Sequence, residues 1–204
     1  MNGNRPDPNM PNRYDGLQLK ILESTLEIVG ELGLENLTIR KVSNHADVSV
    51  GIVHHHFYNK ANLVYKTYDH LIRIAREQMT EMRTETPDPV ERLKHTAELC
   101  FTPELTTKGA ANVWPQMWSN SVYDVRVKRL CTIFSRRLVS NLMYDFVAAG
   151  NRRDLARVYA TQTCALIHGL WVEQSILGTI SVKEAMGMIN SNIESFTGQI
   201  WLPR

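Results

Sequence analysis

The sequence is poor in cysteine and contains no long apolar run, and both absences narrow the class of protein. Its 204 residues include only Cys100, Cys131 and Cys164, which form no Cys-x-x-Cys pair. An odd number of scattered cysteines is typical of free thiols in a reducing compartment. No stretch approaches the roughly 20 apolar residues that span a bilayer, and the first 13 residues lack the apolar segment of a signal peptide. We therefore expect a cytoplasmic protein without a membrane segment, metal ion or cofactor.

A strong excess of charge is also lacking. The formal net charge is +2, and acidic and basic side chains are nearly equal in number over residues 1–70. Charge alone therefore does not indicate a nucleic-acid-binding protein, and such a function must be argued from motif geometry. The apolar share of 43% is ample for a buried core.

Sustained strand alternation is absent, and helical periodicity takes its place. Apolar residues recur every three or four positions from Leu17 to Leu32, and Gly33 is a natural helix end. The prolines in residues 84–89 must break the long helix that begins near Asn59. We predict an all-α fold of about nine helices, with a disordered tail at 1–13, a DNA-binding unit at 14–60 and a larger domain at 61–204. The expected later helices cover 90–101, 108–121, 123–149, 154–178 and 182–200.

The most informative segment is residues 38–60, which begins TIRKVSNHADVSVGIVHHHF. Thr38 and Ser49 are good N-caps for two short helices, and residues 47–49 supply the turn between them. Two short helices joined by a tight turn are how a helix-turn-helix presents side chains to the DNA major groove. In the second helix we expect Ile52, Val53 and His56 to face inward.

The segment also supplies candidate contacts to DNA. Gly51 is unfavourable inside a helix by about 1 kcal/mol, which indicates a close approach of the backbone to DNA; the alternative is a poor residue tolerated near a helix end. Val50 and Ile52 could read only thymine methyl groups. Lys60, beside the next helix N-terminus, suits a phosphate. The complete predicted set is Thr38, Arg40, Lys41, Ser49, Val50, Gly51, Ile52, His54, His55, Tyr58 and Lys60.

The run from His54 to His56 could suggest a metal site. Adjacent helical residues point about 100° apart, so three in a row cannot hold one ion from a single helix. We assign His56 to the core and His54 and His55 to the DNA-facing side.

The layout resembles the TetR family of bacterial transcriptional regulators over residues 14–65, on the 38–57 motif followed by Lys60 and Leu63. Within that family the second half is similar to the choline-responsive BetI repressors, on WPQMWS at 114–119, SRRLVSNL at 135–142 and LIHGLW at 166–171. The resemblance implies a repressor that binds double-stranded operator DNA and an effector such as choline or betaine aldehyde. It also implies a homodimer through the last two helices, where Ala165 and Gly169 would allow close approach and Leu166, Leu170, Ile176 and Ile193 would supply apolar area.

Trp114 and Trp118 lie four residues apart and share a helix face. Such a pair is usually core, but with other aromatic residues nearby it also fits a cage for a quaternary ammonium ion. The predicted ligand-binding set is Trp114, Trp118, Tyr123, Tyr144 and Trp171, although for Trp171 we favour the dimer core over the pocket. The counter-charge could come from Asp124, Asp145 or Glu173. Pro115 should remove a hydrogen bond from the tryptophan helix and bend it.

Three alternatives remain open at this point. A TetR-type repressor could respond instead to an uncharged aromatic, lipid or drug-like effector. A hydrolase using His and Cys is disfavoured because no nucleophile lies on a recognisable turn, so we predict no catalytic residue. A purely structural helical protein would leave the recognition-helix pattern as a coincidence.

Overall fold

All regular secondary structure in the described residues, 14–101 and 108–198 of this computed structural model, is helical. The predicted tail at 1–13 and the expected helix end at residue 200 lie outside those ranges. Within them the chain forms nine α-helices and one π-helical turn, which confirms the all-α prediction. The elements are α1 Gly16–Leu32, α2 Ile39–His45, α3 Val50–Phe57, α4 Lys60–Glu85, α5 Pro89–Leu99, α7 Lys108–Asn120, α8 Val125–Ala148, α9 Arg153–Val172, η1 Glu173–Leu177 and α10 Val182–Thr197.

The helix boundaries follow from residues that cap or break helices. Asp15 caps α1 in a box with Gln18, and Gly33 ends the helix with φ of 82°, a conformation that glycine adopts without a Cβ penalty. Thr38, Ser49 and residue 59 cap α2, α3 and α4 through side-chain oxygens. The pair of prolines near residue 88 separates α4 from α5, as predicted.

The largest difference from the predicted helix boundaries is at the end of α9. The helix expected over 154–178 is α-helical only to Val172 and continues as the π-helical turn η1, which ends at Gly178 with φ of 64°. In this turn the Thr179 hydroxyl donates to the Glu173 backbone carbonyl. Sequence periodicity does not distinguish α from π geometry over a single turn.

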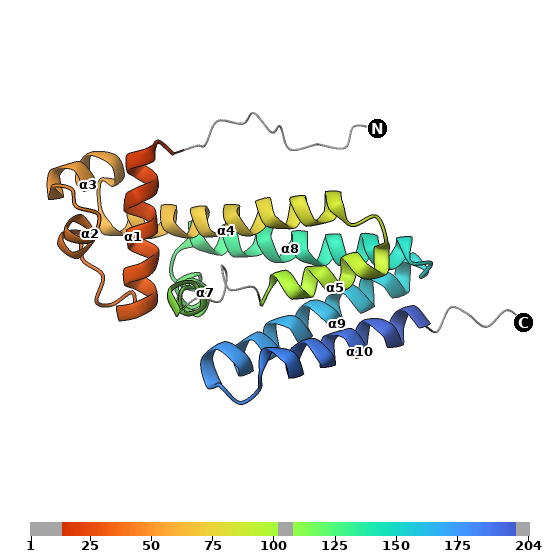
Figure 1. The fold of residues 1–204 in the computed structure, drawn as a ribbon. Helices are drawn as coiled ribbons and strands as arrows, with labels where there is room; N and C mark the ends of the chain where they lie inside the picture. The colour runs from red at the N-terminus through yellow and green to blue at the C-terminus, as the bar shows by residue number, and fades with distance from the viewer. Residues whose placement is uncertain (1–13, 102–107, 199–204) are drawn as a thin grey trace, which may run out of the picture.

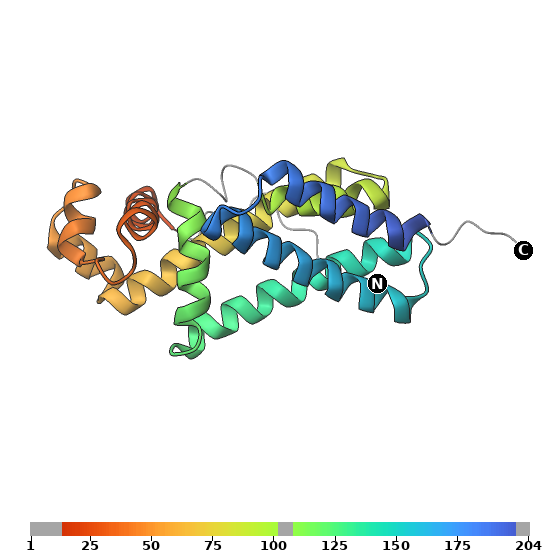
Figure 2. The same ribbon diagram turned by 90° about the horizontal axis from the view of Figure 1, so that it is seen from below.

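Two parts of the molecule are joined by α4 (Figure 1). Helices α1, α2 and α3 form one end, and α4 runs from them into a bundle with α5, α8, α9 and α10. Helix α7 crosses the molecule between the two parts and packs against α1, α8 and η1 (Figures 1 and 2). A structural change in the bundle can therefore reach the first three helices through α4 or through α7.

The core is continuous through both parts. Val42, Val53 and Leu63 of the first part are fully buried, as are Leu142 and Ile193 of the bundle. Burial of Ile193, and of Leu170 at 9% exposure, corrects the prediction that these two residues supply dimer surface, because they pack inside their own chain. Among the described residues, no helix combines the length and apolar character needed to cross a membrane.

A buried ion cluster fixes the bundle at the end remote from α1. Asp145 of α8 is fully buried and accepts hydrogen bonds from Arg83 of α4 and from Arg92 of α5, the latter with Nε 2.8 Å from Oδ1. Arg92 also donates to the backbone carbonyls of Thr86 and Pro87 in the α4–α5 turn. One carboxylate thus ties three helices and a turn together.

Candidate functional site

The first candidate surface is formed by α2, the turn after it and α3. Val42 of α2, Ala46 directly after it, and Val53 and Phe57 of α3 are buried, so the two helices are held by their inner faces. All the predicted DNA contacts except Lys60 are exposed, and Lys60 is half-buried. The arrangement therefore leaves one continuous outer face that includes the start of α3.

Ile52 corrects our expectation about the inner face of α3. It was expected to point inward, but it is 36% exposed and lies on the outer face with Val50, which is 41% exposed. The buried positions are Val53 and Phe57, four residues apart, so α3 rests on a narrower apolar stripe than predicted. Ile52 is consequently available for contact with a partner.

The fold itself does not require glycine at position 51. A methyl group built there would approach only Ser49 Oγ, at 3.7 Å, which is an ordinary contact. A glycine that costs helix stability without an internal steric reason supports an external constraint at this surface.

The three adjacent histidines have separate environments. His56 is half-buried, with Nδ1 3.2 Å from the side-chain nitrogen of Gln18 in α1. His54 and His55 are exposed, as expected, and His54 Nδ1 lies 3.0 Å from the Tyr58 backbone carbonyl. Because a carbonyl only accepts, this contact makes Nδ1 the donor. Within the described ranges no group of three or more His, Cys, Asp and Glu side chains could hold a metal ion.

Two lysines of this surface are hydrogen-bonded to the loop before α2. Lys60 Nζ donates to the Leu34 carbonyl at 3.0 Å, and Lys41 Nζ donates to the Asn36 carbonyl at 3.0 Å. Both ammonium groups have further donors available for an anion. Tyr58, which follows α3 with φ of 63°, projects a side chain that is 77% exposed.

The second candidate site is an apolar pocket between α7, α8 and α9. Trp114 and Trp118 of α7 face Phe134 of α8 and His168 and Trp171 of α9. The ring centroids of Trp118 and Trp171 are 5.5 Å apart, and those of Trp114 and Phe134 are 5.1 Å apart. The pocket has a volume of about 40 Å³ and no Asp, Glu, Lys or Arg side chain in its wall. This is room for about one water molecule, so a larger ligand requires the rings to separate.

Burial determines the charge of His168, the titratable ring in the wall of this pocket. Desolvation lowers the pKa of His168 below its ordinary value of 6.5. The imidazole is therefore neutral at neutral pH and does not repel a cation. Its ring lies 5.6 Å from that of Trp118.

The structure brings together only part of the predicted ligand-binding set. Trp114, Trp118 and Trp171 line the pocket, but Tyr123 and Tyr144 lie outside it and are 86% and 64% exposed. Tyr123 is near Trp118 only in the linear sequence, and Tyr144 is remote from both tryptophans along the chain as well. We therefore remove them from the pocket.

The carboxylates considered as counter-charges also lie elsewhere. Asp124 caps α8 and pairs with Arg126, and Asp145 is held in the buried ion cluster. Glu173 hydrogen-bonds the Thr179 hydroxyl. None of the three lines the aromatic pocket.

Several pocket residues are absent from the predicted set. His168 of α9 and Cys100, which directly follows α5, are two of them, and burial raises the pKa of the Cys100 thiol to about 12. The fragment that contains His168 is one of the motifs of the resemblance, so that signal was available. Nothing in the local sequence around Cys100 indicates a pocket wall.

Helix α7 connects this pocket to the first part of the molecule. Trp114 and Trp118 occupy one side of the helix, while Asn112 and Gln116 face α1. Gln116 accepts from the Leu34 backbone N–H and donates to the Val29 carbonyl at 3.1 Å. Asn112 donates to the Gly30 carbonyl at 2.9 Å. The helix is continuous through Pro115, so one helix carries both sets of side chains.

Two family descriptions match this chain. Residues 21–65 match the bacterial regulatory proteins of the tetR family, and residues 89–198 match the C-terminal domain of BetI-type transcriptional repressors. The chain is 32% identical over 177 residues to an HTH-type transcriptional regulator BetI of Burkholderia ambifaria, with 86% of this chain and 91% of that protein covered. A BetI of Paraburkholderia phytofirmans is 31% identical over the same length.

Solved structures share the fold at lower sequence identity. A transcriptional regulator from Saccharomonospora viridis, in complex with choline, superposes with a TM-score of 0.79 at 23% identity and covers 87% of this chain and 95% of its own. A transcriptional regulator from a Rhodococcus species has the same TM-score at 16% identity, with 92% and 99% covered.

Proposed function

The chain belongs to the TetR family of bacterial transcriptional regulators, in its BetI-type repressor branch, and we propose that choline or a related quaternary ammonium ion is its effector. Family members bind operator DNA through the helix-turn-helix, and we assign this contact to the outer face of α2 and α3. We infer that the protein acts in the cytoplasm, where bacterial operator DNA lies. No catalytic residue forms part of the proposal.

The observation that carries the effector assignment is the aromatic wall around Trp118. A quaternary ammonium ion cannot donate hydrogen bonds, and the faces of Trp and Phe rings attract it electrostatically. Trp114, Trp118, Phe134 and Trp171 supply four rings, and the neutral His168 adds no repulsion. The complex of the Saccharomonospora viridis regulator with choline supports the same ligand class.

The volume of the pocket supports a mechanism in which the ligand selects a second arrangement. At about 40 Å³ the site is too small for a quaternary ammonium group, so α7 must separate from α8 or α9 when the ligand binds. A ligand shifts such an equilibrium only by its difference in affinity for the two arrangements. We infer that the displaced element is α7, which carries the tryptophans on one side and the contacts to α1 on the other.

We propose that Gln116 transmits this displacement to the DNA-binding end. Gln116→Ala removes the hydrogen bonds to Leu34 and Val29. Effector affinity and operator affinity, each measured alone, should change little, but the factor by which effector weakens operator binding should fall severalfold. Coupling factors of about 5–150 are typical of such systems. Isothermal titration for the effector and anisotropy for the operator would measure the three quantities.

Ser119→Ala is the matched control for this prediction. Ser119 lies on the same helix and is exposed, away from the aromatic wall. Unchanged coupling in Gln116→Ala would reject Gln116 as the transmitting residue and leave Asn112 of α7, or α4, to carry the signal.

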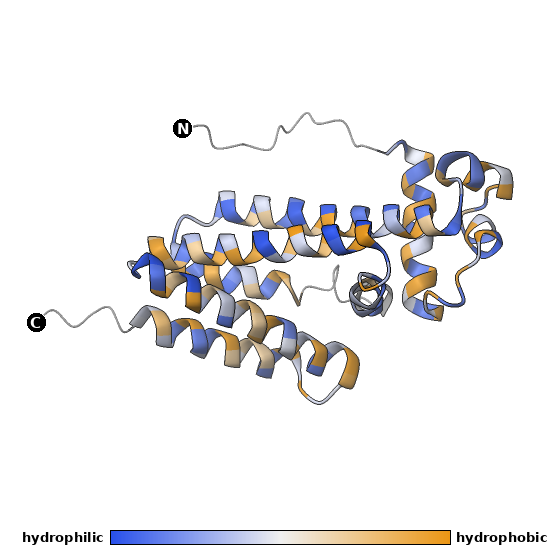
Figure 3. Ribbon diagram, turned by 180° about the vertical axis from the view of Figure 1, so that it is seen from behind, coloured by the Kyte–Doolittle hydropathy of each residue, from blue (hydrophilic) through white to orange (hydrophobic). Residues whose placement is uncertain are grey.

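We propose a homodimer that pairs through α9 and α10. Val158, Ala165 and Gly169 are exposed along α9, and a Cβ built at Gly169 meets no atom within 4 Å. Hydrophobic residues also gather at the turn between α9 and α10 (Figure 3), where Ile176 and Leu177 are 46% and 59% exposed. A symmetric pair would present two recognition helices to a pseudo-palindromic operator.

The experiment that tests the function is fluorescence anisotropy with labelled DNA from upstream of the protein's own gene. We expect tight binding that weakens in millimolar choline or glycine betaine. If DNA binding is unaffected by every quaternary ammonium ion but weakens with uncharged aromatic or lipid compounds, the protein is a repressor with a different class of effector. No binding to any upstream fragment would contradict the assigned DNA contact.

A further inference from the structure

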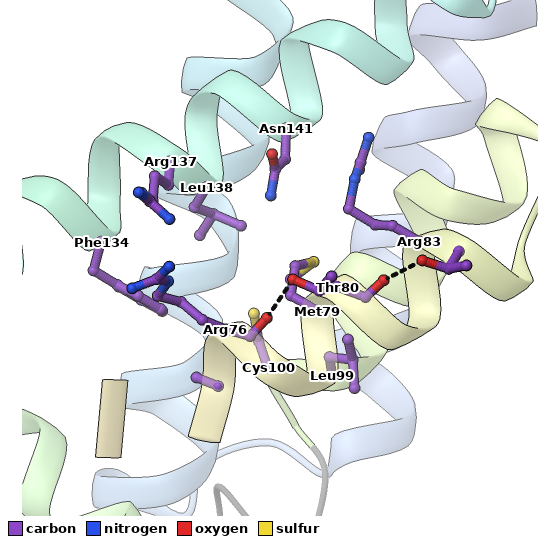
Figure 4. Close-up of a pocket in the computed structure, with 12 residues that line it drawn as sticks. Arg76, Met79, Thr80, Arg83, Leu99, Cys100, Phe134, Arg137, Leu138 and Asn141 are labelled. Atoms are coloured by element: carbon purple, nitrogen blue, oxygen red, sulfur yellow. Dashed lines mark hydrogen bonds between the residues drawn. The ribbon is translucent and has the colours of Figure 1, made fainter. Parts of the chain in front are cut away.

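A larger cavity adjoins the aromatic pocket, and its wall has a different chemical character. It lies between α4, α5 and α8, has a volume of about 440 Å³ and is partly open to solvent. Figure 4 shows the side chains that line it. Arg76, Thr80 and Arg83 follow one another at four and three residues on α4, and Arg137 and Asn141 follow at four on α8. Both helices therefore turn a polar stripe toward the same space.

The positive charge of this cavity is not neutralised within its wall. Neither Arg76 nor Arg137 forms an ion pair in the part of the chain that the structure describes, and no Asp or Glu lines the cavity. Arg83 differs, because Asp145 already binds its guanidinium. Figure 4 shows the side chains of Arg76 and Arg137 approaching each other from opposite helices.

The two guanidinium groups affect each other. Partial burial lowers the pKa of Arg76, and the charge of Arg137 lowers it further, while Asp69 and Glu77 oppose these effects more weakly. Two like charges that approach without a shared carboxylate are destabilising. An anion between them would relieve the repulsion and accept hydrogen bonds from both guanidinium groups.

The cavity and the aromatic pocket share part of their walls. Cys100, Phe134 and Leu138 line both, so the two spaces meet at these three side chains. When the rings separate, a ligand held by the tryptophans can extend past these three side chains toward the arginines. For a simple cation such as choline, this neighbouring charge is unfavourable.

We propose that the effector is a zwitterion in which a quaternary ammonium group occupies the aromatic pocket and a carboxylate or phosphate occupies the cavity between Arg76 and Arg137. This inference rests on the proposed function, because the aromatic pocket orients the ligand. Asn141 adds an amide donor at the same wall. A zwitterion places a cation in the aromatic pocket and an anion in the cavity, whereas choline has no anionic group for the cavity.

The test compares ligands that differ in their anionic group. Isothermal titration in a chloride buffer would measure choline, glycine betaine, carnitine and phosphocholine against the wild-type protein. We expect at least one zwitterion to bind about tenfold more tightly than choline, a difference of about 1.4 kcal/mol. Whether the preferred compound carries a carboxylate or a phosphate identifies the anion.

Variants of the two unpaired arginines give the sharper readout. Arg76→Gln and Arg137→Gln should each weaken the preferred zwitterion about tenfold while choline binds equally well or more tightly, because the repulsion is reduced. Both side chains are exposed and unpaired in the described structure, so the variants should fold. Arg129→Gln on α8, exposed and outside both cavities, is the matched control.

Two outcomes would overturn the proposal, and they separate it from the proposed function. Choline binding that exceeds that of every zwitterion, with both arginine variants unchanged, would reject the anion site and keep the quaternary ammonium effector. Equal binding of neutral tert-butyl isosteres, in which carbon replaces the ammonium nitrogen, would reject cation recognition and therefore both proposals.

Discussion

Asp145→Asn should lower the free energy of unfolding by about 3 kcal/mol or more. The change leaves the guanidinium groups of Arg83 and Arg92, which are 19% and 12% exposed, without their shared carboxylate. The Asp145 carboxylate is fully buried, so water has little access to the position that its charge occupies. For a chain of this length the melting temperature should fall by roughly 6–12 °C. Thermal unfolding at one fixed protein concentration measures it, because dimerisation contributes to the apparent stability.

Asp154→Asn provides the matched control for this prediction. Asp154 pairs with Arg152 at 2.8 Å, but both side chains are well exposed, at 62% and 79%. Solvent screens such a pair, so its loss should leave the melting temperature nearly unchanged. If the two variants had the same melting temperature, the Asp145 cluster would not be a major source of stability for the packing of α4, α5 and α8.

Trp118→Ala should reduce the affinity for a quaternary ammonium ligand by about tenfold or more, with operator affinity nearly intact. A desolvated cation–π contact is worth about 2 kcal/mol, and Trp118 is packed between Trp171 and His168. Trp118→Phe keeps a weaker aromatic face and should recover part of the affinity. Titration with choline and glycine betaine, together with anisotropy for the operator, would measure both effects.

Tyr123→Ala tests whether Tyr123 contributes to ligand binding, as the sequence predicted. Tyr123 was predicted to belong to the same site, but its side chain is 86% exposed and outside the aromatic wall. Its removal should leave ligand affinity unchanged. If circular dichroism showed that Trp118→Ala is unfolded, Trp118 would be a residue of the hydrophobic core and not of a ligand site.

The local features of this protein could be predicted from sequence because they depend on neighbouring residues. Thr38 and Ser49 cap the two short helices whose positions were expected, and Gly33 ends α1. A cap forms within one turn, so its signal is contained in a few adjacent positions. The same holds for the shared face of Trp114 and Trp118, which follows from their spacing on one helix.

Other parts of the candidate site could not be predicted, because they depend on which helices meet. Arg76 and Arg137 are 61 positions apart, and the sequence does not decide whether Arg137 is a solvated charge or a contact to the helix that contains Arg76. Only the packing of α4 against α8 makes them face a common cavity. Asp145 was considered as a ligand counter-charge, and only the arrangement of α4, α5 and α8 assigns it to Arg83 and Arg92.

The sequence by itself determined the helices, the helix-turn-helix and the family resemblance, since these follow from short-range periodicity and from ordered motifs. The tertiary structure decided which side chains share a cavity, because helix packing brings together residues remote along the chain and separates residues close in it. Tyr123 is five positions from Trp118 yet lies on the surface, whereas Trp171 is 53 positions away and touches it. Rotation about the helix axis and the crossing of helices fix such contacts, and neither is contained in the spacing of residues on one helix.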